Sequence, residues 1–165
     1  MERSLSYSTS SQYGWAGKTP ETLAKELKHA LTVFGRLRKK VQFDAIAFTG
    51  SSGAAIAFNI ATKFGIPLIY VRKKSEISHG VKVECNGGGG DNFIKSYMIV
   101  DDFICSGHTI TTIINSITDY TQTRDIHSPT PVGVFCFDDC TVNGHTRDFG
   151  KTTLPVYTTL PRRQK

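Results

Sequence analysis

The sequence lacks the long apolar runs and the dense cysteine pattern that mark membrane proteins and disulfide-rich secreted proteins. No stretch of about 18 apolar residues occurs, which argues against a membrane span. The segment Met1–Gln12 is polar and rich in serine, without the apolar core of a signal peptide, which argues against secretion. The few cysteines are scattered, so we expect a reduced, cytoplasmic setting; they are Cys85, Cys105, Cys136 and Cys140.

Internal repeats and linker-like segments are also missing. The 165 residues, 39% of them hydrophobic, suffice for one domain with its own core, so we predict a single domain over residues 1–165. A zinc site at Cys136 and Cys140, with His145 nearby, is an alternative for part of the chain. A fourth ligand is not evident and the spacing differs from a zinc knuckle, so we favour small buried or half-buried thiols.

The charge is basic, with 20 Lys and Arg against 14 Asp and Glu and a formal net charge of +6. Such a balance suits a small polyanion, an anionic membrane or nucleic acid as partner. Basic residues gather at 36–40, 72–74 and 162–165. We expect the first and last groups to be solvated, whereas the middle group follows an apolar run and is predicted to face a ligand. We therefore expect a small polyanion, and neither nucleic acid nor a membrane.

Hydrophobic periodicity predicts alternating strands and helices. Thr19 and Pro20 begin a helix, whose apolar stripe is Leu23, Leu27, Leu31 and Phe34. A strand at 45–49, a turn at 50–53, a helix at 54–63 and a strand at 68–71 form a βαβ unit with parallel strands. Further strands are predicted at 97–100, 131–137 and 155–158, and a helix at 109–120. The fold class is therefore α/β, a mostly parallel sheet flanked by helices.

The segment Tyr97–Thr109 is the most informative part of the chain. Its apolar run ends in Asp101 and Asp102, and a short loop with Ser, Gly and Thr leads into a helix. Ligands of open α/β sheets bind at the carboxyl ends of strands, and a helix N-terminus attracts anions. Two carboxylates beside such a phosphate cradle suit a phosphorylated sugar. The alternative is a pair of acids that only cap the following helix.

This segment resembles the PRPP-binding motif of the type I phosphoribosyltransferases. The matching parts are Ile99-Val100, Asp101-Asp102 and Ser106-Gly107-His108-Thr109. The resemblance covers residues 19–140 and implies the type I phosphoribosyltransferase fold, with a small hood and a mobile lid loop. We expect the N-terminal arm and the C-terminal segment to form the hood. The implied enzyme is a PRPP-dependent pentosyltransferase of nucleotide salvage or synthesis, a cytoplasmic homodimer that uses Mg²⁺, PRPP and a nucleobase.

The resemblance also implies residue roles in this motif. Asp101 and Asp102 would hold the ribose hydroxyls, directly or through Mg²⁺ and water, and would stabilise the positive charge that develops on the ribose ring. The 5′-phosphate loop would consist of Cys105, Ser106, Gly107, His108 and Thr109. Within it, Cys105 stands where family members usually have a small residue, and His108 occupies the variable position of the motif.

Two further segments are similar to parts of the family that bind pyrophosphate. The turn after the first strand resembles the pyrophosphate loop, without the Lys or Arg that several members carry there; it comprises Thr49, Gly50, Ser51, Ser52 and Gly53. The strand-end group Arg72, Lys73 and Lys74 resembles the Arg-Lys of adenine and orotate phosphoribosyltransferases. The alternative for this group is solvated charge at a strand end.

The lid is expected at residues 75–95, either as a mobile loop or as the tip of a long hairpin, with its glycine run at 87–90. His79-Gly80 resembles a His-Gly of the orotate enzymes. His79 therefore either touches pyrophosphate or is an ordinary exposed loop residue. The lid lacks the Lys that precedes this His-Gly in the orotate enzymes.

The resemblance implies that the nucleobase contacts Phe137 and Asp138, with Phe137 stacking on its ring and Asp138 accepting from a base N–H; a solvated strand end is the alternative. Tyr13, Trp15 or Arg147 are further candidates for the hood. A non-catalytic regulator that binds PRPP or nucleotides and contacts RNA or protein is the alternative function. A dinucleotide-binding enzyme is a third hypothesis, but the sequence lacks the full glycine fingerprint.

Overall fold

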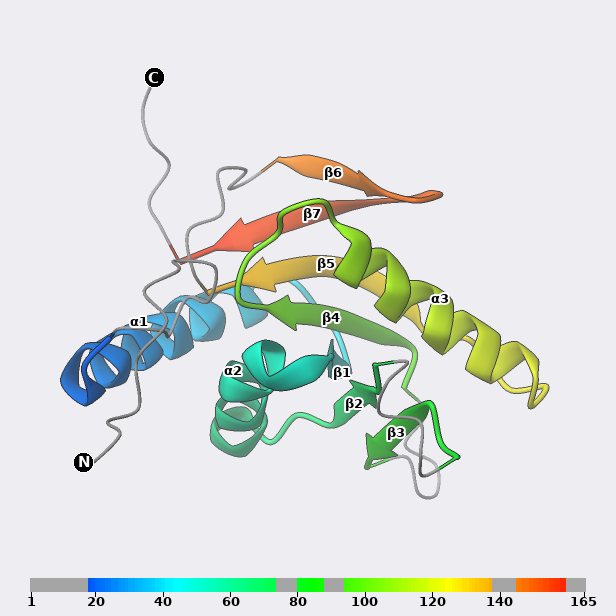
Figure 1. Cartoon of the computed structure of the whole chain (residues 1–165), viewed down its shortest axis with the longest axis horizontal. Coiled ribbons are helices and arrows are strands. Elements are labelled where there is room, and N and C mark those ends of the chain that lie inside the picture. Colours follow the sequence, from blue (N-terminus) through cyan, green and yellow to red (C-terminus); the bar gives the residue numbers. More distant parts are fainter. Residues whose placement is uncertain (1–17, 74–79, 88–93, 138–144, 160–165) are drawn as a thin grey trace, which may run out of the picture.

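The computed structural model describes residues 18–73, 80–87, 94–137 and 145–159. Within these residues the chain forms three α-helices and seven β-strands (Figure 1). In chain order they are α1 (Pro20–Arg38), β1 (Ala45–Phe48), α2 (Gly50–Phe64), β2 (Leu68–Val71), β3 (Val83–Asn86), β4 (Ser96–Asp101), α3 (His108–Gln122), β5 (Thr130–Cys136), β6 (Thr146–Phe149) and β7 (Thr152–Thr158).

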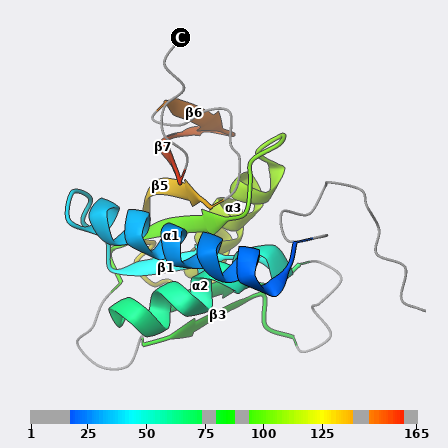
Figure 2. The ribbon, with the colours of Figure 1, turned by 90° about the vertical axis from the view of Figure 1, so that its left-hand side faces the viewer.

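The seven strands form one sheet in the order β3-β2-β1-β4-β5-β7-β6. The five inner strands are parallel, whereas β3 and β6 pair antiparallel with their neighbours at the two edges. Figure 2 shows these edge strands at opposite ends of the sheet. The predicted α/β class with a mostly parallel sheet is confirmed, and the inner strands β1, β2 and β4 are almost wholly apolar because both their faces are covered.

Helix α1 begins as its sequence predicts. Thr19 is the N-cap, and its Oγ1 accepts a hydrogen bond from the backbone N–H of Thr22 at 3.3 Å. The predicted apolar stripe is buried unevenly: Phe34 is fully buried, whereas Leu23, Leu27 and Leu31 are only half-buried. The C-terminal half of α1 therefore carries most of its packing against the sheet.

The predicted turn at 50–53 is wrong, because these residues form the first turn of α2. Ser and Gly are poor helix formers in the interior of a helix. The first turn tolerates them, because its N–H groups have no intrahelical acceptor in any case. Gly50 has a φ of +63°, a left-handed value that glycine adopts without strain. The pattern thus located the strand-to-helix junction correctly and placed the helix start four residues late.

The alternation of apolar and polar residues does not predict the two edge strands β3 and β6. The region 75–95 contains β3, which pairs antiparallel with β2. The glycine run that was predicted as a mobile loop or a hairpin tip follows β3, and residues 88–93 lie outside the described part of the chain. Of the four residues of β3 only Val83 is buried. Strand β6 has the sequence Thr-Arg-Asp-Phe and was not predicted at all. Edge strands of this kind are short and polar, and backbone pairing with a neighbour rather than side-chain burial defines them.

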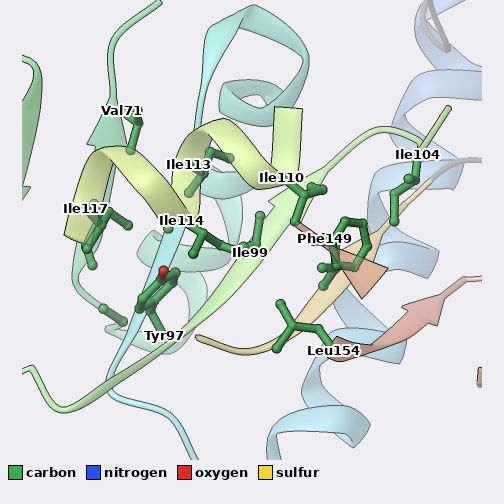
Figure 3. Close-up of a cluster of buried hydrophobic side chains, with 14 of the residues drawn as sticks. Val71, Tyr97, Ile99, Ile104, Ile110, Ile113, Ile114, Ile117, Phe149 and Leu154 are labelled. Atoms are coloured by element: carbon green, nitrogen blue, oxygen red, sulfur yellow. The ribbon is translucent and has the colours of Figure 1, made fainter. Parts of the chain in front are cut away.

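Two hydrophobic clusters lie on opposite faces of the sheet. One joins α1 and α2 to the sheet through residues such as Phe34, Ile60 and Phe135. The other packs α3 on the opposite face, through four isoleucines at helical spacing; these are Ile110, Ile113, Ile114 and Ile117 (Figure 3). Among the described residues, no helix has the length and apolar character that crossing a membrane requires.

Phe34 gives a direct test of this packing. Its ring is 0% exposed and lies 5.1 Å, centroid to centroid, from the ring of Phe135 in the middle of the sheet. We expect Phe34→Ala to lower the free energy of unfolding by about 3–5 kcal/mol, because it removes buried surface and leaves a cavity. Urea denaturation measures the change. Phe58→Ala, at a ring that is 56% exposed, is the control and should cost about 1 kcal/mol or less. Equal losses would contradict the assignment of the core.

Candidate functional site

The two acids at the end of β4 are both buried. Asp101 is 7% exposed and Asp102 is 5% exposed. The Oδ1 atom of Asp101 accepts the N–H of Asp102 at 3.0 Å, and the Oδ1 atom of Asp102 accepts the N–H of Phe103 at 2.9 Å. These bonds hold each carboxylate by one oxygen at the point where β4, the central strand of the sheet, ends.

This arrangement changes the proton affinity of the pair. Burial, and after it the adjacent Asp102 carboxylate, raises the pKa of Asp101 to about 7. The positive charge of Lys73 acts in the opposite direction and lowers the pKa of Asp101. Two neighbouring carboxylates in a low-dielectric environment repel one another, so the pair has a strong affinity for a cation or for developing positive charge.

The loop after β4 forms a cradle of backbone N–H groups. Gly107 is the N-cap of α3 with a φ of +83°, and a Cβ at this position would lie 3.1 Å from Cδ1 of Phe149, so the turn requires glycine. The N–H of His108 donates to Oγ of Ser106 at 3.3 Å. Among the described residues, the N–H groups of Ser106 and Gly107 meet no protein acceptor. They are available to an anion, which the N-terminus of α3 also favours.

A cavity of about 530 Å³ connects the acid pair with this loop. It brings together most of the residues that the motif predicted. Its lining consists of Thr49, Ser52, Lys73, Asp101, Asp102, Phe103, Ile104, Cys105, Ser106, Gly107, His108, Thr109 and Ile110. The acids, the predicted 5′-phosphate loop and parts of the predicted pyrophosphate site therefore share one concave surface.

Lys73 supplies the cation that the turn after β1 lacks in its own sequence. Its Nζ atom lies 2.8 Å from the position that a Cβ on Gly50 would occupy, so the ammonium group sits over the start of α2. Glycine at this position leaves the necessary space. The side chain of Thr49, the residue before Gly50, is fixed because its Oγ1 donates to the carbonyl oxygen of Val71 at 2.6 Å. The end of β2 and the start of α2 thus form one positively charged corner of the cavity.

Some predicted site residues do not reach the cavity. Arg72 turns toward β3, where its Nε donates to Oε1 of Glu84 at 2.7 Å. Gly53 is buried against Phe48 and the Val100 carbonyl, which makes it a packing glycine, and Ser51 is exposed. Phe137 is half-buried beside the acid pair, where its N–H donates to the carbonyl oxygen of Asp101 at 3.3 Å.

Other predicted residues lie outside the described part of the chain. They are Lys74, His79 and Asp138, together with the hood candidates Tyr13 and Trp15. Their assigned roles stay predictions.

The structure adds residues that the motif did not indicate. Phe103, Ile104 and Ile110 line the cavity beside the polar groups. Arg147 donates from β6 to the carbonyl oxygen of Cys105 at 2.8 Å, although 42 residues separate them. The sequence offered Arg147 only as one of three hood candidates, and no local pattern connects a charged residue on an edge strand with a distant loop.

The cysteines divide into two groups. Cys136 is buried in β5, as predicted for the pair Cys136 and Cys140, whereas Cys85 and Cys105, for which no burial was predicted, are exposed. Within the described ranges, no three His, Cys, Asp or Glu side chains gather as metal ligands. Cys140, the second cysteine of the alternative zinc site, lies outside those ranges.

Solved structures with a similar arrangement are phosphoribosyltransferases. An adenine phosphoribosyltransferase from Saccharomyces cerevisiae matches with a TM-score of 0.54 at 17% identity, over 86% of this chain and 80% of that chain. An orotate phosphoribosyltransferase from Aeropyrum pernix matches with a TM-score of 0.51 at 19% identity, over 72% of this chain and 59% of that chain. An adenine phosphoribosyltransferase from Thermoanaerobacter pseudethanolicus gives 0.51 at 15% identity, over 73% and 74% of the two chains.

The chain has the type I phosphoribosyltransferase fold. The predicted resemblance is thereby confirmed at the level of the fold. This chain spans 59% of the length of the Aeropyrum orotate enzyme. No family model and no curated protein sequence matches the chain. In the type I phosphoribosyltransferase fold of this chain, the acid pair and the loop that follows it lie at the carboxyl end of the central strand, where ligands of open α/β sheets bind.

The raised pKa of Asp101 makes a prediction about stability. In the unfolded chain this carboxyl ionises near pH 4, whereas in the folded chain it ionises near pH 7, so between these values the unfolded state releases its proton first. Stability from this group is therefore lost as pH rises from about 4 to about 7. We expect Asp101→Asn to be close to neutral at pH 4.5 and to stabilise by on the order of 2 kcal/mol at pH 8.

Urea denaturation at both pH values measures this difference. Asp119→Asn is the matched control, because the Asp119 side chain is 63% exposed and its carboxylate lies 3.6 Å from Nζ of Lys82. The control should show no such pH dependence. An Asp101→Asn effect of the same size and sign at both pH values would show that burial does not raise the pKa of this group.

Proposed function

We propose that this protein transfers 5-phosphoribose from PRPP to a ring nitrogen of a nucleobase and releases pyrophosphate, as an enzyme of nucleotide salvage or synthesis. The observation that carries the proposal is the buried pair Asp101 and Asp102, which shares one cavity with a cradle of backbone N–H groups. A phosphorylated sugar presents a dianionic phosphate at one end and hydroxyl groups with a developing positive charge at the other. The cavity has complementary groups at both ends.

The chemistry assigns a task to each part of the cavity. The bond from C1 of the ribose to the pyrophosphate oxygen breaks, and the electron pair leaves with pyrophosphate. The ring nitrogen of the base donates its electron pair to C1 and afterwards loses its proton. Positive charge develops on the ribose ring in between, and the carboxylates of Asp101 and Asp102 stabilise it electrostatically because burial strengthens their field. The same carboxylates accept hydrogen bonds from the ribose hydroxyls.

Mg²⁺ fits the acid pair by its donor chemistry. Each carboxylate uses one oxygen for a backbone N–H, so its other oxygen is not taken up by the backbone. Mg²⁺ prefers oxygen donors and is usually bound by one or two carboxylates together with substrate phosphates and water. Asp101 and Asp102 would hold it directly or through water, with PRPP completing the shell. When bound, the ion would neutralise charge on the pyrophosphate as that group leaves.

Pyrophosphate is assigned to the positively charged corner at Lys73, with the Thr49 and Ser52 side chains beside it. An ammonium group can follow the charge that builds on the leaving group. Arg72, which pairs with Glu84, would have to exchange that partner for pyrophosphate. Lys74, His79 and a lid over residues 75–95 complete the proposal from the sequence resemblance.

The acceptor base is proposed to bind near Phe137, whose backbone N–H already contacts the Asp101 carbonyl. Asp138 and a hood that includes the N-terminal arm would complete this side. The homodimer and the cytoplasmic location also belong to the proposal, and they rest on the sequence resemblance.

A regulator that binds PRPP and contacts RNA is favoured by one observation. Arg36, Lys39 and Lys40 are exposed near the end of α1 and form no ion pair with another described residue. Nucleic acid would neutralise such a cluster, with an affinity that falls steeply as salt increases. Filter binding to RNA at several salt concentrations separates this function from the transferase.

The transferase predicts that Asp101→Asn combined with Asp102→Asn abolishes turnover in a folded protein. We expect a loss of at least about 100-fold in kcat, because the double variant removes the negative charge that stabilises the transition state. The assay mixes protein, Mg²⁺ and PRPP with orotate, adenine, guanine, hypoxanthine, xanthine, uracil and nicotinamide, and detects the new nucleotide by mass spectrometry. Asp119→Asn serves as the control with an unchanged rate.

The possible results separate the two functions. A nucleotide product that disappears in the double variant identifies a transferase and its acceptor together. Absence of product, with a clear thermal shift on adding PRPP, supports the regulator. Full activity in the double variant would refute the role of the acid pair.

Lys73 is predicted to act mainly on pyrophosphate. We expect Lys73→Gln to raise KM for PRPP by about tenfold, because one charge-assisted hydrogen bond to the diphosphate is lost. Steady-state kinetics at fixed Mg²⁺ measure the change, and Lys63→Gln, on the exposed last turn of α2, is the control. An unchanged KM in Lys73→Gln would place the diphosphate elsewhere.

A further inference from the structure

Arg147 connects the edge strand β6 with the phosphate loop. Its Nη2 atom donates to the carbonyl oxygen of Cys105 at 2.8 Å. The same atom lies 3.8 Å from the position of a Cβ on Gly107, the residue that begins α3. In Figure 1 the loop between β4 and α3 passes across β5 and β7 toward β6. The guanidinium group is therefore bonded to the middle of the loop and lies close to its last residue.

This contact determines where the next N–H group points. The described residues contain no cis peptide bond, so the C=O of Cys105 and the N–H of Ser106 lie on opposite sides of one planar unit. Arg147 is not part of the cavity lining, whereas Cys105 and Ser106 are. With its carbonyl turned back toward Arg147, the peptide directs the Ser106 N–H away from the arginine, and Ser106 itself lines the cavity.

The guanidinium group is held in place from below. Phe149, two residues further along β6, is 2% exposed and belongs to the same buried cluster as Ile104 and Ile110, which flank the loop (Figure 3). The guanidinium carbon of Arg147 lies 5.8 Å from the centre of the Phe149 ring. Because β6 is anchored in the core, the Arg147 side chain is already in contact with the loop before a phosphate binds. Phosphate binding therefore loses little side-chain entropy at this residue.

The charge of Arg147 also acts on the loop. No carboxylate pairs with Arg147 among the described residues, and the cavity lining has two aspartates against the single cation of Lys73. The positively charged guanidinium of Arg147 donates to the Cys105 carbonyl oxygen. This hydrogen bond polarises the peptide and strengthens the Ser106 N–H as a donor. The loop itself contains no lysine or arginine that could do this.

We infer that Arg147 is a positioning residue for phosphate binding: it holds the Cys105 peptide so that the Ser106 N–H meets the 5′-phosphate. The inference rests on the proposed function, because it requires that this loop binds a phosphate. Arg147 acts through the loop backbone and does not itself touch the reacting atoms.

Kinetics of Arg147→Ala and Arg147→Lys test this role. We expect Arg147→Ala to raise KM for PRPP by about tenfold with kcat within about twofold of wild type, since one oriented, charge-assisted donor is weakened. Arg147→Lys keeps the charge and should recover part of the loss. Arg124→Ala is the matched control, because its guanidinium covers the Tyr120 ring at the far end of α3 and should leave both constants unchanged.

A second readout does not depend on turnover. Inorganic phosphate is titrated into ¹⁵N-labelled protein while the Ser106 and Gly107 amide signals are followed by NMR. In wild type and Arg124→Ala both amides should shift, and in Arg147→Ala the same shift should need about ten times more phosphate. Equal phosphate affinity in Arg147→Ala and wild type would overturn the inference. An Arg147-dependent shift in a protein without turnover would support the inference while the transferase proposal fails.

Discussion

The buried pair of carboxylates at the end of β4 is the constraint on which the rest of the site depends. Two adjacent acids that are 7% and 5% exposed destabilise the fold unless something offsets their charge. Backbone N–H groups of Asp102 and Phe103 offset part of it, and Lys73 approaches from β2. The part of the charge repulsion and burial cost that these groups do not offset raises the pKa of Asp101. A site that holds negative charge at such a cost in stability is suited to a ligand that brings positive charge to it.

Sheet topology explains why the complementary groups meet there. Parallel order places the carboxyl ends of β1, β2 and β4 at one edge, so the residues that follow each strand converge although the chain separates them by tens of positions. Thr49 follows β1, Lys73 follows β2, and the loop at residues 102–107 follows β4. The antiparallel strand β6 brings Arg147 to the same loop from the opposite direction along the chain. The site is thus a property of strand order rather than of any single motif.

The local sequence predicted strands β1, β2 and β4 well because their burial on both faces produces unambiguous apolar runs. It predicted poorly where backbone pairing alone defines the structure, as in β3 and β6, and where the first turn of a helix has the composition of a loop, as in α2. The positions of the acid pair and of the loop after it were predictable because these residues are contiguous. The contacts of Arg72 with Glu84 and of Lys73 with the Gly50 corner were not, since side-chain direction at a strand end depends on neighbouring strands.

The sequence by itself therefore determined the fold class, the position of the acid pair and the composition of the loop that follows it. Each of these is written in consecutive residues, through alternation, helical periodicity and the requirement for glycine at a left-handed turn. The tertiary structure decided which cations serve the site: it directs Lys73 toward the cavity, turns Arg72 toward β3, and places Arg147 behind the loop. Long charged side chains have many rotamers, and only the packed surroundings select one of them.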